Sequence, residues 1–287
     1  TERRKPMKIG IIAADRRMDA IAAQLSTRFL HVTLHHPDDG ILPLCADDVL
    51  IFPLPMTRLS ADWDKCVPGS DGDTVVRMIR ALPGDKLLLG GAPDPLHIRL
   101  AEEYGSVLLD YCDDETVRLK NAVPTAEGVI GIAIEKLPYT IWGSRFAVTG
   151  YGKCARALAV RLKALGGHVT VAARREDART EAFLDGCDTM PLADFLTAPP
   201  PVRCVFNTIP AKIFPEDFCD RLPADTLFVE LAGERALPVC DRVLYAPGLP
   251  GKTAPETAGE ILCDAILPRI RRYQQTHVPK AKGGDGE

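Results

Sequence analysis

The sequence has little that would place it in a membrane, on nucleic acid or around a metal. No apolar run approaches the roughly 20 residues that cross a bilayer, and no apolar secretion signal follows the polar start. Lys and Arg (35) nearly balance Asp and Glu (39), which argues against a broadly basic nucleic-acid binder. The nine cysteines form no CxxC pair or Cys/His cluster, so neither a structural zinc site nor a disulfide framework is indicated. We therefore expect a cytoplasmic protein with reduced thiols and no metal, membrane or nucleic-acid partner.

What the sequence does have is a regular alternation of short apolar runs and helical stretches. Strands that alternate with helices predict parallel sheets covered on both faces. The predicted strands are 8–13, 31–34, 49–52, 86–90 and 106–110 in the first half and 145–149, 168–172, 204–207, 226–230 and 243–245 in the second. The predicted fold class is therefore α/β, with two doubly wound parallel-sheet domains.

The same pattern predicts domain boundaries. An amino-terminal domain at 1–120 leads into a connecting helix at 121–140, with Pro124 expected in its first turn. A second α/β domain at 141–255 follows. A last amphipathic helix at 256–275 is expected to pack back toward the region between the domains. The tail at 276–287 is expected to be disordered.

A dinucleotide-binding fingerprint follows the first strand of the second half. Gly150-Tyr151-Gly152-Lys153-Cys154-Ala155 is the G-x-G-x-x-A pattern, and it closes an apolar strand and opens an amphipathic helix. Gly150 permits the tight turn, Gly152 lets a pyrophosphate approach the backbone, and Ala155 keeps the helix near the strand. The helix N-terminus offers N–H groups to the phosphates. We expect a carboxy-terminal Rossmann NAD(P)-binding domain after a flavodoxin-like amino-terminal one, with Cys154 as a packing residue.

The end of the second strand favours NADP over NAD. Arg174 and Arg175 stand where an acidic residue would bind a ribose 2′-hydroxyl. Arginine suits a 2′-phosphate because it donates charge-assisted, bidentate hydrogen bonds. NAD stays the alternative, with Glu176 or Asp177 as its partner and the arginines in solvent or stacked on adenine.

Further loops after strand ends are predicted to complete the cofactor site. In doubly wound sheets, cofactors bind at the carboxyl ends of the strands. The predicted contacts to the ribose and nicotinamide come from Asn207, Thr208, Ile209, Pro210, Leu231, Ala232, Pro247 and Gly248. Each segment could also be an ordinary strand-ending turn.

Several stretches together resemble the family of the dipicolinate synthase A subunit. They are 121–128 (NAVPTAEG), the fingerprint at 150–155, 207–210 (NTIP), 246–251 (APGLPG) and 253–259 (TAPETAG). The resemblance covers nearly the whole chain and implies the two-domain fold of 2-hydroxy-acid and alanine dehydrogenases. It also implies NAD(P)-dependent oxidation of dihydrodipicolinate, or of its hydrated precursor, to dipicolinate (pyridine-2,6-dicarboxylate). This reaction would occur during spore formation, alongside the flavoprotein B subunit of the same synthase. We further expect a homo-oligomer.

One segment departs from the family pattern. After Leu231-Ala232 the family has a serine and a Pro-Gly-Gly turn, whereas this chain has GERALP at 233–238. The loop is expected near the nicotinamide or the substrate, so its detailed contacts should differ while the fold is retained.

The substrate that the resemblance implies carries two carboxylates, so its site needs two anchors. Asp15 and Arg16 follow the first strand and are candidate catalytic residues. Arg16 is expected to clamp one carboxylate, with Arg17 as the competitor. Both domains are expected to bring their residues to one cleft that closes on binding.

The second anchor is expected at the start of the connecting helix. Asn121, Thr125 and the free N–H groups of a first turn there would hold the other carboxylate, and Lys252 and Thr253 could also reach the substrate. Aromatisation releases a proton, for which Glu127 is the candidate base. A capping or structural role for Glu127 is the alternative.

Two other classes of function stay open. One is a different two-domain dehydrogenase, acting on a 2-hydroxy or 2-amino acid, although none of the six histidines lies in the motifs. The other is a nucleotide-binding, non-catalytic protein whose partner performs the chemistry.

Overall fold

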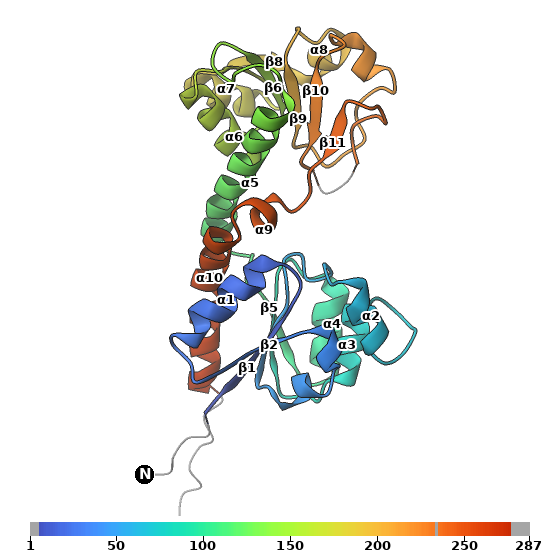
Figure 1. The fold of residues 1–287 in the computed structure, drawn as a ribbon, viewed down its shortest axis with the longest axis vertical. Coiled ribbons are helices and arrows are strands. Elements are labelled where there is room, and N and C mark those ends of the chain that lie inside the picture. The colour runs from blue at the N-terminus through green and yellow to red at the C-terminus, as the bar shows by residue number, and fades with distance from the viewer. Residues whose placement is uncertain (1–5, 233–234, 277–287) are drawn as a thin grey trace, which may run out of the picture. The chain divides into compact units, whose positions relative to one another are not determined.

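The computed structural model describes residues 6–232 and 235–276, which fold into two compact units (Figure 1). The first unit contains the chain up to Val117 and again from Pro255, and the second contains Arg118–Ala254. The tail expected to be disordered lies, except for Thr276, outside the described residues. None of the helices in the described ranges is both long and apolar enough to cross a bilayer.

The first unit contains a sheet of five parallel strands. They are β1 (Lys8–Ile12), β2 (His31–His35), β3 (Val49–Ile51), β4 (Leu87–Gly90) and β5 (Val107–Asp110). Their order across the sheet is β2-β1-β3-β4-β5, which is the flavodoxin-like order. The predicted flavodoxin-like architecture is therefore confirmed.

Helices cover both faces of this sheet. They are α1 (Arg16–Ser26), α2 (Ala61–Cys66), α3 (Thr74–Ala81), α4 (Pro95–Glu103) and α10 (Pro255–Thr276), with 3-10 turns η1 (Pro37–Asp39) and η2 (Pro43–Ala46). On one face, α1 and α10 lie side by side, and Ile9 and Ile11 of β1 pack with Leu262 of α10 (Figure 1). On the other face, Leu50 packs with residues of α2, α3 and α4, including Trp63. The alternation of side chains along each strand supplies both cores.

The second unit contains a sheet of six parallel strands. They are β6 (Arg145–Thr149), β7 (His168–Ala173), β8 (Asp188–Pro191), β9 (Cys204–Asn207), β10 (Leu227–Glu230) and β11 (Val243–Tyr245). The order is β11-β10-β9-β6-β7-β8, which is the Rossmann order 3-2-1-4-5-6 read from the opposite edge. The sequence pattern predicts only five strands here. It misses β8 because this half-exposed edge strand has no apolar run, and its Pro191 is tolerated only at an edge.

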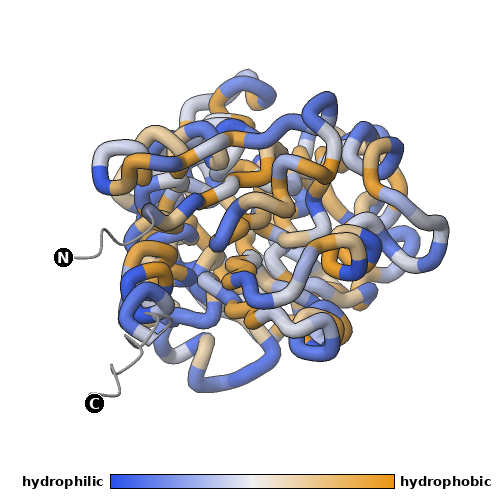
Figure 2. The backbone as a smooth tube through the Cα atoms, turned by 90° about the horizontal axis from the view of Figure 1, so that it is seen from below, coloured by the Kyte–Doolittle hydropathy of each residue, from blue (hydrophilic) through white to orange (hydrophobic). Residues whose placement is uncertain are grey.

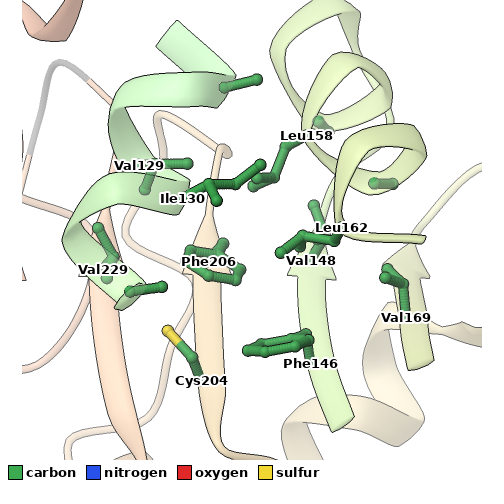
Figure 3. Close-up of a cluster of buried hydrophobic side chains, with 14 of the residues drawn as sticks. Val129, Ile130, Phe146, Val148, Leu158, Leu162, Val169, Cys204, Phe206 and Val229 are labelled. Atoms are coloured by element: carbon green, nitrogen blue, oxygen red, sulfur yellow. The ribbon is translucent and has the colours of Figure 1, made fainter. Parts of the chain in front are cut away.

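The helices of the second unit pack on two separate apolar clusters. They are α5 (Glu115–Lys136), α6 (Lys153–Ala164), α7 (Glu176–Leu184), α8 (Leu192–Thr197) and α9 (Leu249–Thr253), with the 3-10 turn η3 (Phe218–Arg221). Figure 3 shows Val129 and Ile130 of α5 and Leu158 and Leu162 of α6 around Phe206 of β9. In the hydropathy-coloured trace, hydrophobic segments run through the interior and many peripheral loops are hydrophilic (Figure 2).

One local prediction is wrong. The connecting helix begins at Glu115 rather than Asn121, so Pro124 lies inside α5 instead of in its first turn. Proline has a helical φ and removes only one donor, so a packed helix can continue through it. The predicted cofactor loop after β11 leads into the short helix α9, which begins at Leu249 with Pro250 in its first turn.

Candidate functional site

The turn between β6 and α6 has the geometry of a dinucleotide-binding turn. Gly150 has a φ of +82°, which favours glycine, and a Cβ there would lie 2.9 Å from Thr208 Oγ1. Gly152 is the N-cap of α6, and a Cβ there would meet no heavy atom within 4 Å. The fold therefore requires glycine at position 150, whereas the space beside position 152 is open.

The residues between and after these glycines pack into the unit. Ala155 is fully buried in the core that α6 shares with the sheet. Burial raises the pKa of the Cys154 thiol, which fits a packing role better than a reactive thiolate. The Tyr151 hydroxyl donates to Asp185 Oδ2 at 2.7 Å and so fastens the turn to the end of α7. Lys153 is half-buried in the first turn of α6.

The two arginines after β7 differ in their surroundings. Arg175 Nε donates to Asp177 Oδ1 at 2.8 Å, and this ion pair lowers the pKa of Asp177. Arg174 is exposed and makes no ion pair with any described residue. Of the two guanidinium groups, that of Arg174 is free to bind an added anion.

A row of three buried polar side chains crosses the sheet where β6, β9 and β10 end. Thr149, Asn207 and Glu230 are aligned neighbours in the strand register, and each is at most 1% exposed. Thr149 Oγ1 donates to Asn207 Oδ1 at 2.6 Å, and Asn207 Nδ2 donates to Glu230 Oε1 at 2.9 Å. These hydrogen bonds tie the carboxyl ends of three adjacent strands together.

The loops that follow this row are bonded to it. The N–H groups of Ala232, Ala236 and Leu237 donate to the Glu230 carboxylate at 2.9, 3.1 and 3.0 Å. The departure from the family pattern falls in this loop, and Gly233 and Glu234 lie outside the described residues. Glu230 was not among the predicted site residues. Its one signal was an acidic residue that ends the otherwise apolar strand TLFVE.

The last predicted cofactor segments lie at and before α9. Gly248, after the half-buried Pro247, has a φ of +66° and is the N-cap of this helix. Thr253 Oγ1 donates to Leu249 O at 2.9 Å within α9, and Lys252 is exposed. Of the other predicted cofactor contacts, Thr208, Ile209 and Leu231 are half-buried, Ala232 is buried and Pro210 is exposed.

Glycines in two of the family-like stretches allow helices to pack closely. A Cβ on Gly128 of α5 would lie 2.7 Å from Thr253 Oγ1 and 3.1 Å from Leu249 Cβ of α9. A Cβ on Gly259 of α10 would lie 2.5 Å from Ala20 Cβ of α1. NAVPTAEG and TAPETAG thus each contain a glycine on which a helix crossing depends.

The predicted substrate residues of α5 are in the helix interior. Because α5 begins at Glu115, the expectation of free first-turn N–H groups near Asn121 is wrong. Thr125 Oγ1 donates to Asn121 O at 2.9 Å, and the buried Asn121 Oδ1 accepts no hydrogen bond from any described residue. Glu127 is exposed and its carboxylate lies 3.4 Å from Arg161 Nε of α6. Its contacts are those of a surface carboxylate, and its role as a base stays a prediction.

The three charged residues after β1 divide into a bonded pair and a free arginine. Asp15 caps α1 by accepting from Arg17 N at 3.0 Å, and it also accepts from Arg17 Nε at 2.8 Å. Arg17 is 2% exposed and donates to Leu54 O, so its guanidinium is already engaged. Burial opposes ionisation of Asp15, but Arg17 holds the pKa of that carboxyl below its ordinary value. Arg16 is exposed at the start of α1 and makes no ion pair with a described residue.

No three side chains of the usual metal-ligating types come together anywhere in residues 6–232 or 235–276.

Comparison with known proteins by sequence finds a relative over nearly the whole chain. No protein-family model matches the chain. The A subunit of dipicolinate synthase from Bacillus subtilis is 26% identical over 293 residues, which cover 93% of this chain and 97% of that protein.

Solved structures share the fold. The dipicolinate synthase A chain from Bacillus subtilis superposes with a TM-score of 0.74 at 22% identity, covering 95% of this chain and 98% of its own. Its counterpart from Bacillus halodurans gives 0.73 at 24% identity, with coverages of 92% and 97%. A phosphoglycerate oxidoreductase from Vibrio cholerae gives 0.62 at 16% identity, with coverages of 94% and 99%. The two-domain fold, the flavodoxin-like and Rossmann strand orders and the sequence match lead to one conclusion: over nearly its whole length, this chain resembles the A subunit of dipicolinate synthase.

Proposed function

We propose that this chain is an oxidoreductase that binds a nicotinamide cofactor at the carboxyl edge of the second unit's sheet. The observation that carries the proposal is the β6–α6 turn, in which Gly150 is required by the fold and Gly152 faces open space. A phosphate in that space would accept hydrogen bonds from the N–H groups in the first turn of α6. The cofactor, when bound, supplies a hydride acceptor.

We propose NADP(H) as the preferred form. Support comes from Arg174, which is exposed directly after β7 and has no ion-pair partner among the described residues. A 2′-phosphate would give that guanidinium a bidentate, charge-assisted partner. NAD is the alternative, since Glu176 and Asp177 follow in the same segment.

We propose dihydrodipicolinate, or its hydrated precursor, as the substrate, with dipicolinate as the product. The name of the 26%-identical relative supports this choice. The same resemblance suggests the flavoprotein B subunit of dipicolinate synthase as the partner and spore formation in the cytoplasm as the setting. Arg16 would bind a substrate carboxylate, because the competing Arg17 is committed to Asp15 and Leu54 O.

Product and cofactor absorbance test this function. The chain is mixed with freshly generated substrate and NADP⁺, with and without the flavoprotein partner. We expect dipicolinate and NADPH to form together whenever the chain is present. Product formation by the flavoprotein alone would instead indicate that this chain is its non-catalytic, nucleotide-binding partner. Turnover of a 2-hydroxy or 2-amino acid, with none of dihydrodipicolinate, would support the other dehydrogenase class.

The substrate role of Arg16 has its own test. Arg16→Ala should raise KM for the substrate and leave NADPH affinity intact, because the side chain lies in the other unit from the fingerprint. An unchanged KM would remove Arg16 from the proposed site.

A further inference from the structure

The Glu230 carboxylate is buried in the second unit and accepts several hydrogen bonds. It is 1% exposed, Oε1 accepts from Ala232 N–H, and Oε2 accepts from Ala236 and Leu237 N–H. Asn207 Nδ2 also donates to it. No cationic side chain in the described part of the chain pairs with it. The buried charge is therefore compensated by backbone N–H groups, and these hydrogen bonds hold Ala232, Ala236 and Leu237 in place.

The same row fixes a second loop. Asn207 Oδ1 accepts from Ile209 N–H at 3.0 Å, and Thr208 Oγ1 donates to Thr149 O at 2.7 Å. Asn207 can hold this orientation because its amide donates to Glu230 while its oxygen accepts from Thr149. The loops after β9 and β10 are thus set by one connected row of side chains.

The loops after β9 and β10 and the residue Arg174 after β7 lie toward opposite ends of the strand order. A dinucleotide crosses the edge of the sheet where the strand order reverses, with one half on each side. Here the reversal lies between β6 and β9. Arg174 follows β7, so the adenosine half belongs on that side. The nicotinamide half then belongs over the ends of β9 and β10.

We infer that Glu230 is a positioning residue for the nicotinamide half of the cofactor. Its buried carboxylate holds the described parts of the loops after β9 and β10 through Asn207 and through the N–H groups of Ala232, Ala236 and Leu237, and it does not touch the cofactor itself. The inference rests on the proposed function, because it takes the ligand to be a nicotinamide dinucleotide.

Glu230→Gln is the direct test, because it keeps the shape of the side chain. The glutamine amide group would face either the Ala232 N–H or the Ala236 and Leu237 N–H groups, so donors would oppose donors. By calorimetry, NADPH should bind about tenfold more weakly, the effect of leaving a buried donor unpaired. Adenosine 2′,5′-bisphosphate, which lacks the nicotinamide half, should bind as it does to the unmodified chain.

Asp225→Asn is the matched control. Asp225 precedes β10, at the opposite end of the same strand, and it accepts from Tyr139 Oη at 3.0 Å and from Arg203 at 2.5 Å. The variant also exchanges a carboxylate for an amide. Both ligands should bind to it as to the unmodified chain.

The outcomes separate the inference from the proposed function. If the unmodified chain binds neither ligand, the proposed function fails and the inference fails with it. If the unmodified chain binds NADPH, then equal affinity in Glu230→Gln overturns the inference alone. Equal weakening of both ligands also overturns it, because that is the effect of a general structural role.

A milder variant covers the case in which Glu230→Gln does not fold. Thr149→Val keeps the side-chain shape and removes the hydroxyl that donates to Asn207 Oδ1. It should weaken NADPH binding in the same direction by a smaller factor and leave the bisphosphate unaffected. Unchanged NADPH binding by this variant would overturn the inference.

Discussion

At the residue scale, neighbouring arginines differ in whether the guanidinium group already has an ion-pair partner, and so in whether it can bind a ligand. Arg175 is held by Asp177 and Arg17 by Asp15, whereas Arg174 and Arg16 are exposed and make no ion pair with a described residue. A pair that already exists must be broken before its arginine can bind an anion. The unpaired member of each couple is therefore the better anion ligand.

Arg174→Ala should weaken NADP⁺ binding by about 1–3 kcal/mol, because a charge-assisted hydrogen bond to the 2′-phosphate is lost. NAD⁺ binding should hardly change. Arg175→Ala is the matched control and should have the smaller effect on NADP⁺. Titration calorimetry with NADP⁺ and with NAD⁺ measures the affinities of both variants and of the unmodified chain. Equal affinity of the unmodified chain for NADP⁺ and NAD⁺ would contradict the assignment.

Asp15→Asn should reveal the ion pair with Arg17 as a pH-dependent contribution to stability. Asparagine keeps the helix cap, so the loss is that of the charged partner, about 1–2 kcal/mol at pH 7 for this partly exposed carboxylate. Because the folded-state pKa of Asp15 is lowered, its contribution is present above the ordinary pKa of 3.8 and is lost as pH falls through the folded value.

The measurement is urea unfolding of Asp15→Asn and the unmodified chain from pH 7 downward. The difference in unfolding free energy should be constant at neutral pH and shrink below about pH 4. A difference that persists unchanged into acid would show that the ion pair does not contribute.

Residue types predicted the β6–α6 turn better than they predicted the polar network beside it. Gly150 and Gly152 are recognisable because their spacing is tied to a strand and a helix. Glu230 is not recognisable from the sequence, because an acidic residue at a strand end can have many roles. Only the strand register, which places it beside Asn207, indicates its role here. Arg16 and Arg17 were left as competitors because burial, not sequence, separates them.

At the element scale, two helix crossings depend on glycine. Gly128 lets α5 contact α9, and Gly259 lets α10 contact α1. The first crossing lies within the second unit and the second crossing within the first unit.

Gly128→Ala should destabilise the chain by about 1–3 kcal/mol, because the new methyl group would overlap Thr253 and Leu249. Gly131→Ala lies in the same helix at an exposed position with no heavy atom within 4 Å of the Cβ. It should stabilise by about 0.5–1 kcal/mol through helix propensity alone. Thermal and urea unfolding of the two variants measure the contrast. A stabilising effect at both positions would show that α9 does not pack closely on α5.

Strong periodicity predicted most elements, and the misses have physical causes. β8 is short, half-exposed and carries Pro191, so it lacks the apolar run of a buried parallel strand. The start of α5 was placed too late because Pro124 resembles a first-turn proline, while the helix in fact continues through it. Local sequence does not report the tertiary packing that keeps such a helix intact.

At the scale of the whole molecule, the chain builds one flavodoxin-like unit, then one Rossmann unit, and returns to the first through α10. The alternation of strands and helices predicted this two-sheet α/β class. The alternation alone does not give the strand orders, since pairing between non-consecutive strands such as β6 and β9 has no local signal. The flavodoxin-like and Rossmann orders were predicted only together with the dinucleotide fingerprint and the family resemblance.

The central claim is that the β6–α6 turn binds a nicotinamide dinucleotide, and Gly152→Val tests it most directly. The Cβ direction at this position is open, so the variant should fold, with only the small loss of stability that valine causes at a helix N-cap. The added side chain would occupy the space proposed for the pyrophosphate. Calorimetric titration with NADPH should therefore show binding to the unmodified chain and none to the variant. Binding of NADPH to folded Gly152→Val with unchanged affinity would contradict the account.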